Sequence, residues 1–558
     1  MSLRTLLTLA FCILPLLGSA AGRFAYRLGS ATGRSELPFD PDYNILVSVD
    51  LNRLIRYEGM EEGRKIATET RQEINRTWHN LNQHLRHAEA EGRTLCLVGQ
   101  EVSFPREIWE SLLERAPDRE NPGRVDLDSP VFWSLYRSKY RELLSRLPER
   151  VGAVMITSGE PFEGERFRGQ TVLDRTYDDR YFRVMSRLIS ETRSLVVDEG
   201  KRTLIWRLWD RGNEGLHANP AVYDRLFAGV TNRTGLVLSL KYTRSDFWIY
   251  NEPNPSIARR GIPQIIEFQP ILKYGGRGAF PNYPGVEYAT AIRRALAQGI
   301  QGIYCHGITP GGPAVKSGIW RDLNLYALIE LARNPRWTPE NIALAWAIRF
   351  FGKEASSGLL PILMKSRECV KRIFYVEAYA RRHPGWMVNQ GLFCGDLIRG
   401  DGGQGRNGPI GRLYEGARSD LMGALQEKRD AVALAYQLRE DFERLREPIV
   451  KAKGVRRYEE ALTGFIYLQQ LANVACHYVR GIFLFYRWQE DPGGVACAQA
   501  AYHELKAWEA AWKAYRNEIP LLPGAPSLFR SDGKGGMEET CIRALDQVKE
   551  AFPDLSKR

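Results

Sequence analysis

Two short runs of apolar, β-branched residues near the middle of the chain end abruptly in charged and aromatic residues. Residues 237–240 lead into Lys241 and then Asp246, and residues 265–266 lead into Glu267. Continuous apolar runs of this length are typical of parallel strands that are buried on both faces. In a barrel of such strands, the polar residues at the carboxyl ends form the site. The pattern therefore predicts a binding cleft where these two runs end.

The same alternation of short apolar runs and longer amphipathic stretches continues on both sides of this segment, over residues 44–335. It favours a parallel sheet with helices between its strands. We count seven clear strands, one short of a closed barrel, and residues 23–28 are the candidate for the eighth. The fold predicted is an α/β, (β/α)8 TIM-type barrel after a polar leader at 22–43. Further strands are expected at 43–49, 94–99, 151–157, 203–208 and 302–306, and helices at 60–91, 130–147, 178–198, 220–228, 286–298 and 322–332.

After Pro335 the pattern becomes helical to the end of the chain, which predicts an α-helical C-terminal domain at 336–558. Thr338 followed by Pro339 is a helix start, because threonine caps the first turn and proline fits its first position. The exception is a Gly-rich stretch at 383–412. A loop this long is a functional or mobile segment and not a tight connection, and of the helical half it is the segment that we expect to contribute to the neighbouring barrel site.

The first 21 residues have the pattern of a secretory signal peptide. Arg4 precedes a short apolar core that ends in Gly18-Ser19-Ala20, and this core is too short to span a membrane. The sequence thus predicts a secreted or periplasmic protein with no membrane partner.

The composition limits the classes of partner and cofactor that are expected. The net charge is +12, but basic residues are scattered among acids and do not form a stripe, so no nucleic-acid partner is expected. A polyanionic substrate would be attracted by the same charge. The cysteines after Cys12 are widely spaced with no CxxC pair, so neither a zinc site nor a dense disulfide framework is expected. No motif for a metal or another cofactor is visible, and none is expected. Cys96 and Cys305 fall in strand-like runs and should be buried, while one or two disulfides are possible in the C-terminal half.

Further predicted strand ends carry polar residues as well, and together they hold two kinds of chemistry. Opposed carboxylates are what glycoside hydrolysis requires, as an acid and as a base or nucleophile. Arginine and lysine suit a carboxylate on the substrate, and tryptophan or tyrosine could stack on a sugar face. From these residues alone, a carbohydrate-active barrel that prefers acidic sugars is predicted. The candidates are Glu160, Arg207, Lys241, Asp246, Glu267, Lys273 and His306, with Trp206, Trp209, Trp248 and Tyr274 as the aromatics.

Six segments in the same order resemble the α-glucuronidases of glycoside hydrolase family 67, over roughly residues 93–352. One resembles the helix before the family's acid-bearing strand, one its acid motif and one its next strand. The others resemble a strand ending in Lys, Asp-Phe and Glu-Pro, an EFQ…EY-x-G segment, and the helices after the barrel. In order they are DLDSPVFWSLYRSKY, TSGEP, IWR, LKYTRSDFWIYNEP, IIEFQPILKYGGRG and WRDLNLYALIELARNPRWTPENIA.

The resemblance implies specific roles. Glu160 takes the general-acid position, one residue out of register with the family motif, and Asp246 takes a base position. Arg207 and Lys241 fall where the family binds the glucuronate carboxylate. Glu267 matches an accompanying residue, so a buried hydrogen-bonding role and a binding role are both open for it. The implied activity is an inverting α-glucuronidase that removes a uronic acid from an acidic oligosaccharide or polysaccharide.

The chain also departs from the family. Lys273 stands where the family has its second base carboxylate, and it could instead hold a substrate carboxylate or sulfate. The family's third basic residue is absent around Ile156, and no counterpart of its N-terminal β-rich domain is expected before the first predicted strand. The alternatives are therefore a non-catalytic or altered-mechanism relative that binds acidic polysaccharide, and a glycosidase for another sugar. The oligomeric state is left open by the sequence.

Overall fold

The computed structural model describes residues 24–30, 37–158, 166–170, 177–209, 215–259, 261–306, 318–383, 391–522, 528–531 and 533–557. The expected signal peptide at 1–21 lies outside these residues. So does the expected general acid Glu160. Among the described residues, no helix is both long and apolar enough to cross a membrane.

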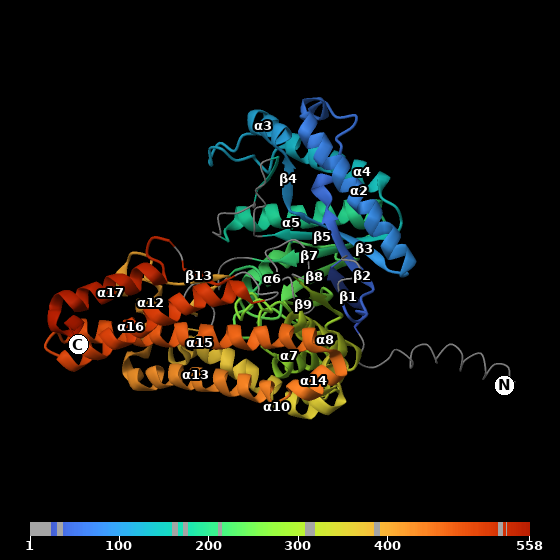
Figure 1. The fold of residues 1–558 in the computed structure, drawn as a ribbon. Coiled ribbons are helices and arrows are strands. Elements are labelled where there is room, and N and C mark those ends of the chain that lie inside the picture. Colours follow the sequence, from blue (N-terminus) through green and yellow to red (C-terminus); the bar gives the residue numbers. More distant parts are fainter. Residues whose placement is uncertain are drawn as a thin grey trace.

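Eight parallel strands close into a barrel, which confirms the predicted fold. Around the barrel the order is β1-β10-β9-β8-β7-β5-β3-β2, and Figure 1 shows the strands at the centre of the N-terminal half. Their bounds are β1 Tyr26–Ser30, β2 Ile45–Asp50, β3 Thr94–Gln100, β5 Val151–Ser158, β7 Thr203–Leu208, β8 Leu236–Lys241, β9 Gln264–Phe268 and β10 Gly302–Cys305.

The eighth strand lies inside the stretch assigned to a polar leader. β1 pairs with β10 on one side and with β2 on the other, so it closes the barrel. The barrel therefore begins at Tyr26, and the boundary of 44 was wrong. Arg27 and Gly29 interrupt the apolar run, and β1 is a strand because it supplies the two edges that would otherwise stay unpaired.

Helices cover the outside of the barrel, as the alternation predicts. Asn219 caps α6 through its side chain, with Pro220 at the first position, and Ser129 does the same for α4 before Pro130. These helices are α2 Thr68–Ala90, α4 Pro130–Arg146, α5 Asp179–Arg193 with a π-helical continuation at Ser194–Glu199, α6 Pro220–Ala228, α7 Gly285–Ala297 and α8 Ile319–Arg333.

An antiparallel pair of strands next to β3 was not predicted. β4 (Val102–Pro105) pairs with β6 (Phe167–Gln170), and α3 (Arg106–Arg115) follows β4. Four residues a strand are too few for a periodic pattern to show in the sequence. The short helical turns η2 (Leu51–Arg53) and η3 (Glu62–Lys65) precede α2, so the predicted helix start at 60 was eight residues early.

The C-terminal half is helical, as expected. Thr338 accepts a hydrogen bond from Asn341 N and caps α9, with Pro339 at its first position. The predicted Gly-rich loop contains two short strands that join a third in a small sheet. The elements are α9 Pro339–Phe351, α10 Lys353–Phe374, α11 Glu377–Arg382, β11 Phe393–Cys394, β12 Leu397–Ile398, α12 Pro409–Ala417, α13 Leu421–Glu443, α14 Arg446–Lys453, α15 Val455–Glu490, α16 Val495–Glu518, β13 Arg530–Ser531 and α17 Met537–Ala551.

The barrel and the helical half share one hydrophobic core. On the barrel side, Trp320 of α8 contacts Phe465 of α15 edge to face, with ring centroids 5.4 Å apart. In Figure 1, α15 runs from the far end of the helical half to the barrel helices α7 and α8. The cysteines after Cys12 are all free, so no disulfide was found in the described part, and Cys96 and Cys305 are buried as expected.

Candidate functional site

Three neighbouring strands bring charged residues to the carboxyl end of the barrel interior. Lys241 of β8 lies opposite Glu267 of β9, and Arg207 of β7 lies opposite Ser239 of β8. Successive side chains of a strand point to opposite faces. Arg207, Lys241 and Glu267 share the parity of Ile205, Val237 and Ile265, which form the inner barrel cluster. The three charged side chains therefore point into the barrel.

Arg207 and Glu267 form a buried, bidentate ion pair. Arg207 Nε donates to Glu267 Oε2 at 2.6 Å and Nη2 donates to Oε1 at 2.8 Å. Burial by itself raises the pKa of Glu267, but the Arg207 guanidinium, together with His306 and Lys241, lowers that pKa to about 2. The structure thus gives Glu267 the buried hydrogen-bonding role that the sequence left open. One edge of the Arg207 fork is committed to this pair and does not face a substrate.

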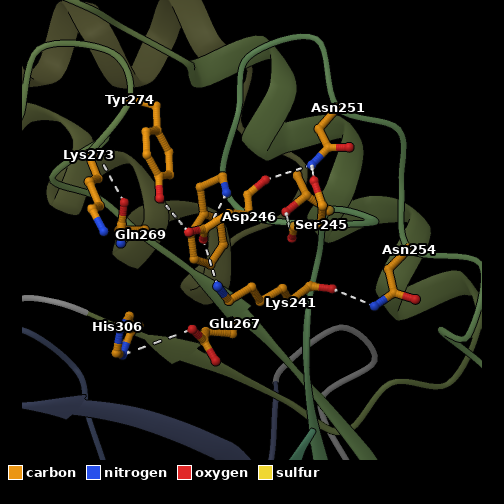
Figure 2. A network of polar contacts seen from close by, with 12 residues as sticks. Lys241, Ser245, Asp246, Asn251, Asn254, Glu267, Gln269, Lys273, Tyr274 and His306 are labelled. Atoms are coloured by element: carbon orange, nitrogen blue, oxygen red, sulfur yellow. Dashed lines mark hydrogen bonds and ion pairs between the residues drawn. The ribbon is translucent and has the colours of Figure 1, made fainter. Parts of the chain in front are cut away.

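Asp246 lies in the segment after β8 and is held through both carboxylate oxygens. Lys241 Nζ donates to Oδ1 at 2.6 Å, and the Tyr274 hydroxyl donates to Oδ2 at 2.6 Å; Figure 2 shows both side chains pointing at this carboxylate. Burial by itself raises the pKa of Asp246, but Lys241 and Tyr274 lower it to about 2. Asp246 is therefore ionised at any ordinary pH and cannot donate a proton to a leaving group.

Two asparagines fix the backbone around this carboxylate. Asn251 Nδ2 donates to the Asp246 carbonyl and to Ser245 Oγ, each at 2.6 Å. Asn254 Nδ2 donates to the Lys241 carbonyl at 3.1 Å. Backbone groups buried away from water need such partners. The segment after β8 is thereby tied to the strand end that it leaves, and Asp246 is held in place.

The Lys241 ammonium lies between a carboxylate and two aromatic rings. Its Nζ is 3.2 Å from the Trp209 ring centroid and 4.9 Å from that of Phe247. Contacts of this kind stabilise a cation in a desolvated place. Burial lowers the pKa of Lys241, while Asp246 and Glu267 oppose that shift.

The aromatic residues take different roles from those expected. Trp206 shares the parity of Leu204 and Leu208 and is fully buried in the core between barrel and helices. The prediction that it stacks on a sugar was wrong, because its side chain points out of the barrel. Trp209, three residues on, is the tryptophan of this strand end that reaches the site.

Trp248 and Tyr274 stack on each other, with ring centroids 3.9 Å apart and planes 13° from parallel. Trp248 is only 1% exposed. The pair therefore forms a wall that supports the Tyr274 hydroxyl, and Trp248 offers no open face to a sugar in this structure.

His306 and Lys273 complete the described rim. His306 Nδ1 is 3.9 Å from Glu267 Oε1 and 3.3 Å from the hydroxyl of Tyr304. Burial lowers the pKa of His306 to about 4, helped by the nearby cations, so its ring is neutral near pH 7. Lys273 donates its backbone N–H to Gln269 Oε1 at 2.9 Å. Its ammonium lies 5.2 Å from the Tyr274 ring centroid and adds to the lowering of the Asp246 pKa.

The Gly-rich loop of the helical half reaches this site, as expected from the sequence. The Arg399 guanidinium lies 5.4 Å from the Trp248 ring centroid. A Cβ on Gly391 would lie 3.3 Å from the Trp248 ring, and one on Gly395 would lie 3.9 Å from Lys273 Cε. The loop backbone therefore passes close to the rim at these two glycines. The sequence pointed to this loop, but nothing in it singled out Arg399.

Glu160 follows β5, which ends at Ser158. It lies outside the described residues, so its role as the general acid stays a prediction. Of the predicted carboxylates that the structure describes, Asp246 is ionised in a polar cage and Glu267 is held in an ion pair.

Comparisons with known proteins support the fold. No protein-family model matches the chain, and no curated protein matches it. Among solved structures, the chain is similar to a GH138 enzyme targeting pectin rhamnogalacturonan II. The TM-score is 0.62 at 11% identity, over 96% of this chain and 84% of that one. At this identity the likeness shows the shared architecture, a barrel followed by helices.

Two weaker matches are also glycoside hydrolases by their descriptions. One is a family GH115 4-O-methyl-α-glucuronidase with specificity for decorated arabinogalactans, with a TM-score of 0.42 and 13% identity over 88% of this chain and 62% of that one. The other is a mutant of the Thermobaculum terrenum O-GlcNAc hydrolase, with a TM-score of 0.40 and 10% identity over 96% of each chain. The specific resemblance to family 67 stays a prediction.

Proposed function

We propose that this protein is an exported glycoside hydrolase of the α-glucuronidase type, which removes a uronic acid from an acidic oligosaccharide or polysaccharide. One observation carries the proposal: an ionised carboxylate, Asp246, is held by Lys241 and Tyr274 at the carboxyl end of a closed parallel barrel. Active sites of such barrels lie at this end. The similar GH138 enzyme targets a pectin by its description, which is consistent with a carbohydrate substrate here.

In the proposed mechanism, Asp246 accepts the proton of a water that attacks the anomeric carbon, and Glu160 protonates the leaving oxygen. Two such carboxyl groups on opposite faces of the sugar give hydrolysis with inversion. Asp246 suits the acceptor role because it is ionised, and neither it nor Glu267 can be the acid, since each has a pKa of about 2.

Lys241 is the residue that would couple binding to catalysis. In the free protein its ammonium is bound to Asp246, and an adjacent cation makes a carboxylate a weak base. A substrate carboxylate that shares this ammonium would weaken the Lys241–Asp246 pair. The pKa of Asp246 would then rise in the complex, so that it becomes a better base when the correct sugar is bound.

The pH profile tests the role of Lys241. Asp246 accepts a proton only when ionised, so activity is present above its pKa and is lost as the pH falls through it. In Lys241→Met, burial raises that pKa without the opposing ammonium, and we expect the acidic limb of kcat/KM to move up by about 1–3 pH units. Lys273→Met is the matched control, because its effect on Asp246 is smaller than that of Lys241. Equal shifts in both variants would contradict the coupling.

The role of Glu160 as the general acid is tested with two substrates that differ in their leaving group. Glu160→Gln should lower hydrolysis of a natural uronate-capped oligosaccharide by about 100- to 10,000-fold, the usual worth of a positioned acid. With a dinitrophenyl glycoside the leaving group needs no proton, so the same variant should retain most of its activity. Steady-state rates on the two substrates measure this difference, and equal losses on both would remove Glu160 from the acid role.

A second candidate is a non-catalytic relative that binds acidic polysaccharide. It is favoured by the low pKa of Asp246, since a pKa of about 2 makes a poor general base in the free protein. Calorimetric binding of uronate oligosaccharides by purified protein, with no reducing sugar released over long incubation, would select this function over hydrolysis.

A further inference from the structure

A polar pocket lies on the side of the barrel where β2 leads into α2. Its volume is about 550 Å³, and it is lined by η2, by the middle of α2 and by the start of β6. In Figure 1, α2, α3 and β4 lie on the side away from helices α13 and α10 of the C-terminal half. The lining residues are Arg53, Glu73, Arg76, Thr77, Asn80, Arg166 and Phe167.

The lining carries an excess of positive charge. Three guanidinium groups face one carboxylate in this pocket, that of Glu73. Arg53 forms an ion pair with Glu73, and Arg166 Nη1 lies 3.9 Å from its other oxygen. Arg76 is exposed and makes no hydrogen bond or ion pair with the described residues. A guanidinium binds carboxylate or sulfate oxygens in a bidentate manner. An anion in this pocket would therefore meet the Arg76 guanidinium, which no described residue binds.

The pocket is close to the expected acid along the chain. Arg166 follows Glu160 by six residues, and a segment of that length spans at most about 20 Å when fully extended. A glycan whose terminal sugar sits in the barrel has to leave it over one of the loops at this end. A charged pocket between η2, α2 and the start of β6 is well placed to hold a more distant part of that glycan.

The geometry points to this pocket as a docking site for the acidic groups, carboxylate or sulfate, of a glycan chain beyond the sugar that is cleaved. The inference rests on the proposed function for its substrate class, but binding at the pocket requires no turnover. Glu73 neutralises Arg53 and orients it, and Arg76 with Arg166 provides the charge that recognises the anion. Non-specific attraction to the net charge of the whole protein would not depend on any one of these residues.

Reversing one charge tests the site. We expect Arg76→Glu to weaken binding of a galacturonic-acid oligosaccharide by about tenfold or more, as measured by isothermal titration calorimetry, because a carboxylate then faces the anion. The matched control is Arg86→Glu: Arg86 is also exposed on α2 but lies ten residues further along, about 15 Å down the helix axis. The two variants have the same net charge, so a general effect of charge would lower both affinities equally.

Titrations with two acidic probes show which anionic group the pocket binds. A galacturonic-acid oligosaccharide tests carboxylate and a sulfated dextran oligosaccharide tests sulfate; the one whose affinity depends on Arg76 identifies the group bound. A neutral maltooligosaccharide should bind to neither variant. Equal affinities of Arg76→Glu and Arg86→Glu for both acidic probes, or equal binding of the neutral one, would overturn the docking site.

Kinetics distinguish this site from the cleavage site. Arg76→Glu should lower kcat/KM for a long acidic glycan by about tenfold but leave hydrolysis of a small aryl uronide unchanged, since that substrate does not reach the pocket. If the protein hydrolyses neither substrate, the proposed function fails while the binding measurement still decides the docking site. If hydrolysis is normal and both variants bind equally, only the docking site fails.

Discussion

Asp246→Asn is expected to lower the rate of uronic-acid release by about 100- to 10,000-fold, the range for loss of a positioned acid–base group. The amide keeps the shape of the carboxylate and can still accept the hydrogen bond that Tyr274 donates. It cannot accept a proton from water, so kcat should fall much more than KM rises. The measurement is steady-state hydrolysis of a uronate-capped oligosaccharide, with thermal unfolding to show that the variant is folded.

The matched control for this change is Asp224→Asn. Asp224 of α6 is exposed and paired with Arg259, so the same loss of a carboxylate at the surface should leave the rate unchanged. Full activity of folded Asp246→Asn would remove Asp246 from the base role. Glu267 on the neighbouring strand β9 would not replace it readily, because Arg207 binds both of its oxygens.

Glu267→Gln is expected to lower the free energy of unfolding by about 3–5 kcal/mol, the usual cost of breaking a buried ion pair. Glu267 is fully buried, so the substitution leaves the Arg207 charge inside the barrel without its anion. Urea unfolding measures this as a lower transition midpoint with an unchanged dependence on denaturant. Loss of activity should follow, because Arg207 and Lys241 belong to the same rim.

Two further variants test whether the expected loss of stability in Glu267→Gln comes from the burial of the ion pair. Glu252→Gln breaks an exposed pair with Arg244 and should cost less than about 1 kcal/mol. The double variant Arg207→Met, Glu267→Met removes both charges and should recover much of the lost stability, since apolar residues often replace a buried pair at little cost. A Glu267→Gln variant as stable as Glu252→Gln would mean that water reaches the pair.

The barrel was predictable because each central strand is buried on both faces and so appears as an unbroken apolar run. β7 was predicted to the residue, and β5 and β3 to within one. The charged residues that follow such runs are gathered at one end by the parallel arrangement, whatever the details of packing. For that reason Arg207, Lys241 and Glu267 could be predicted to lie together from the sequence alone.

The same burial hides which way each side chain points. In a strand buried on both faces, apolar residues occupy inward and outward positions alike, so hydrophobicity alone does not separate Trp206, which packs under the helices, from Trp209, which reaches the site. From the sequence, β1 was only a candidate strand for a related reason. Its apolar run is interrupted by polar residues, and only the need to close the barrel makes it a strand.

By itself, the sequence determined the fold class, the end of the barrel that carries the site, and most of the charged residues there. Only the tertiary structure decided their partners: Glu267 for Arg207, two strands away, and Lys241 with Tyr274 for Asp246. The physical reason is that local pattern fixes where strands begin and end. The charge state of a side chain depends instead on groups brought within about 3 Å of it by distant parts of the chain.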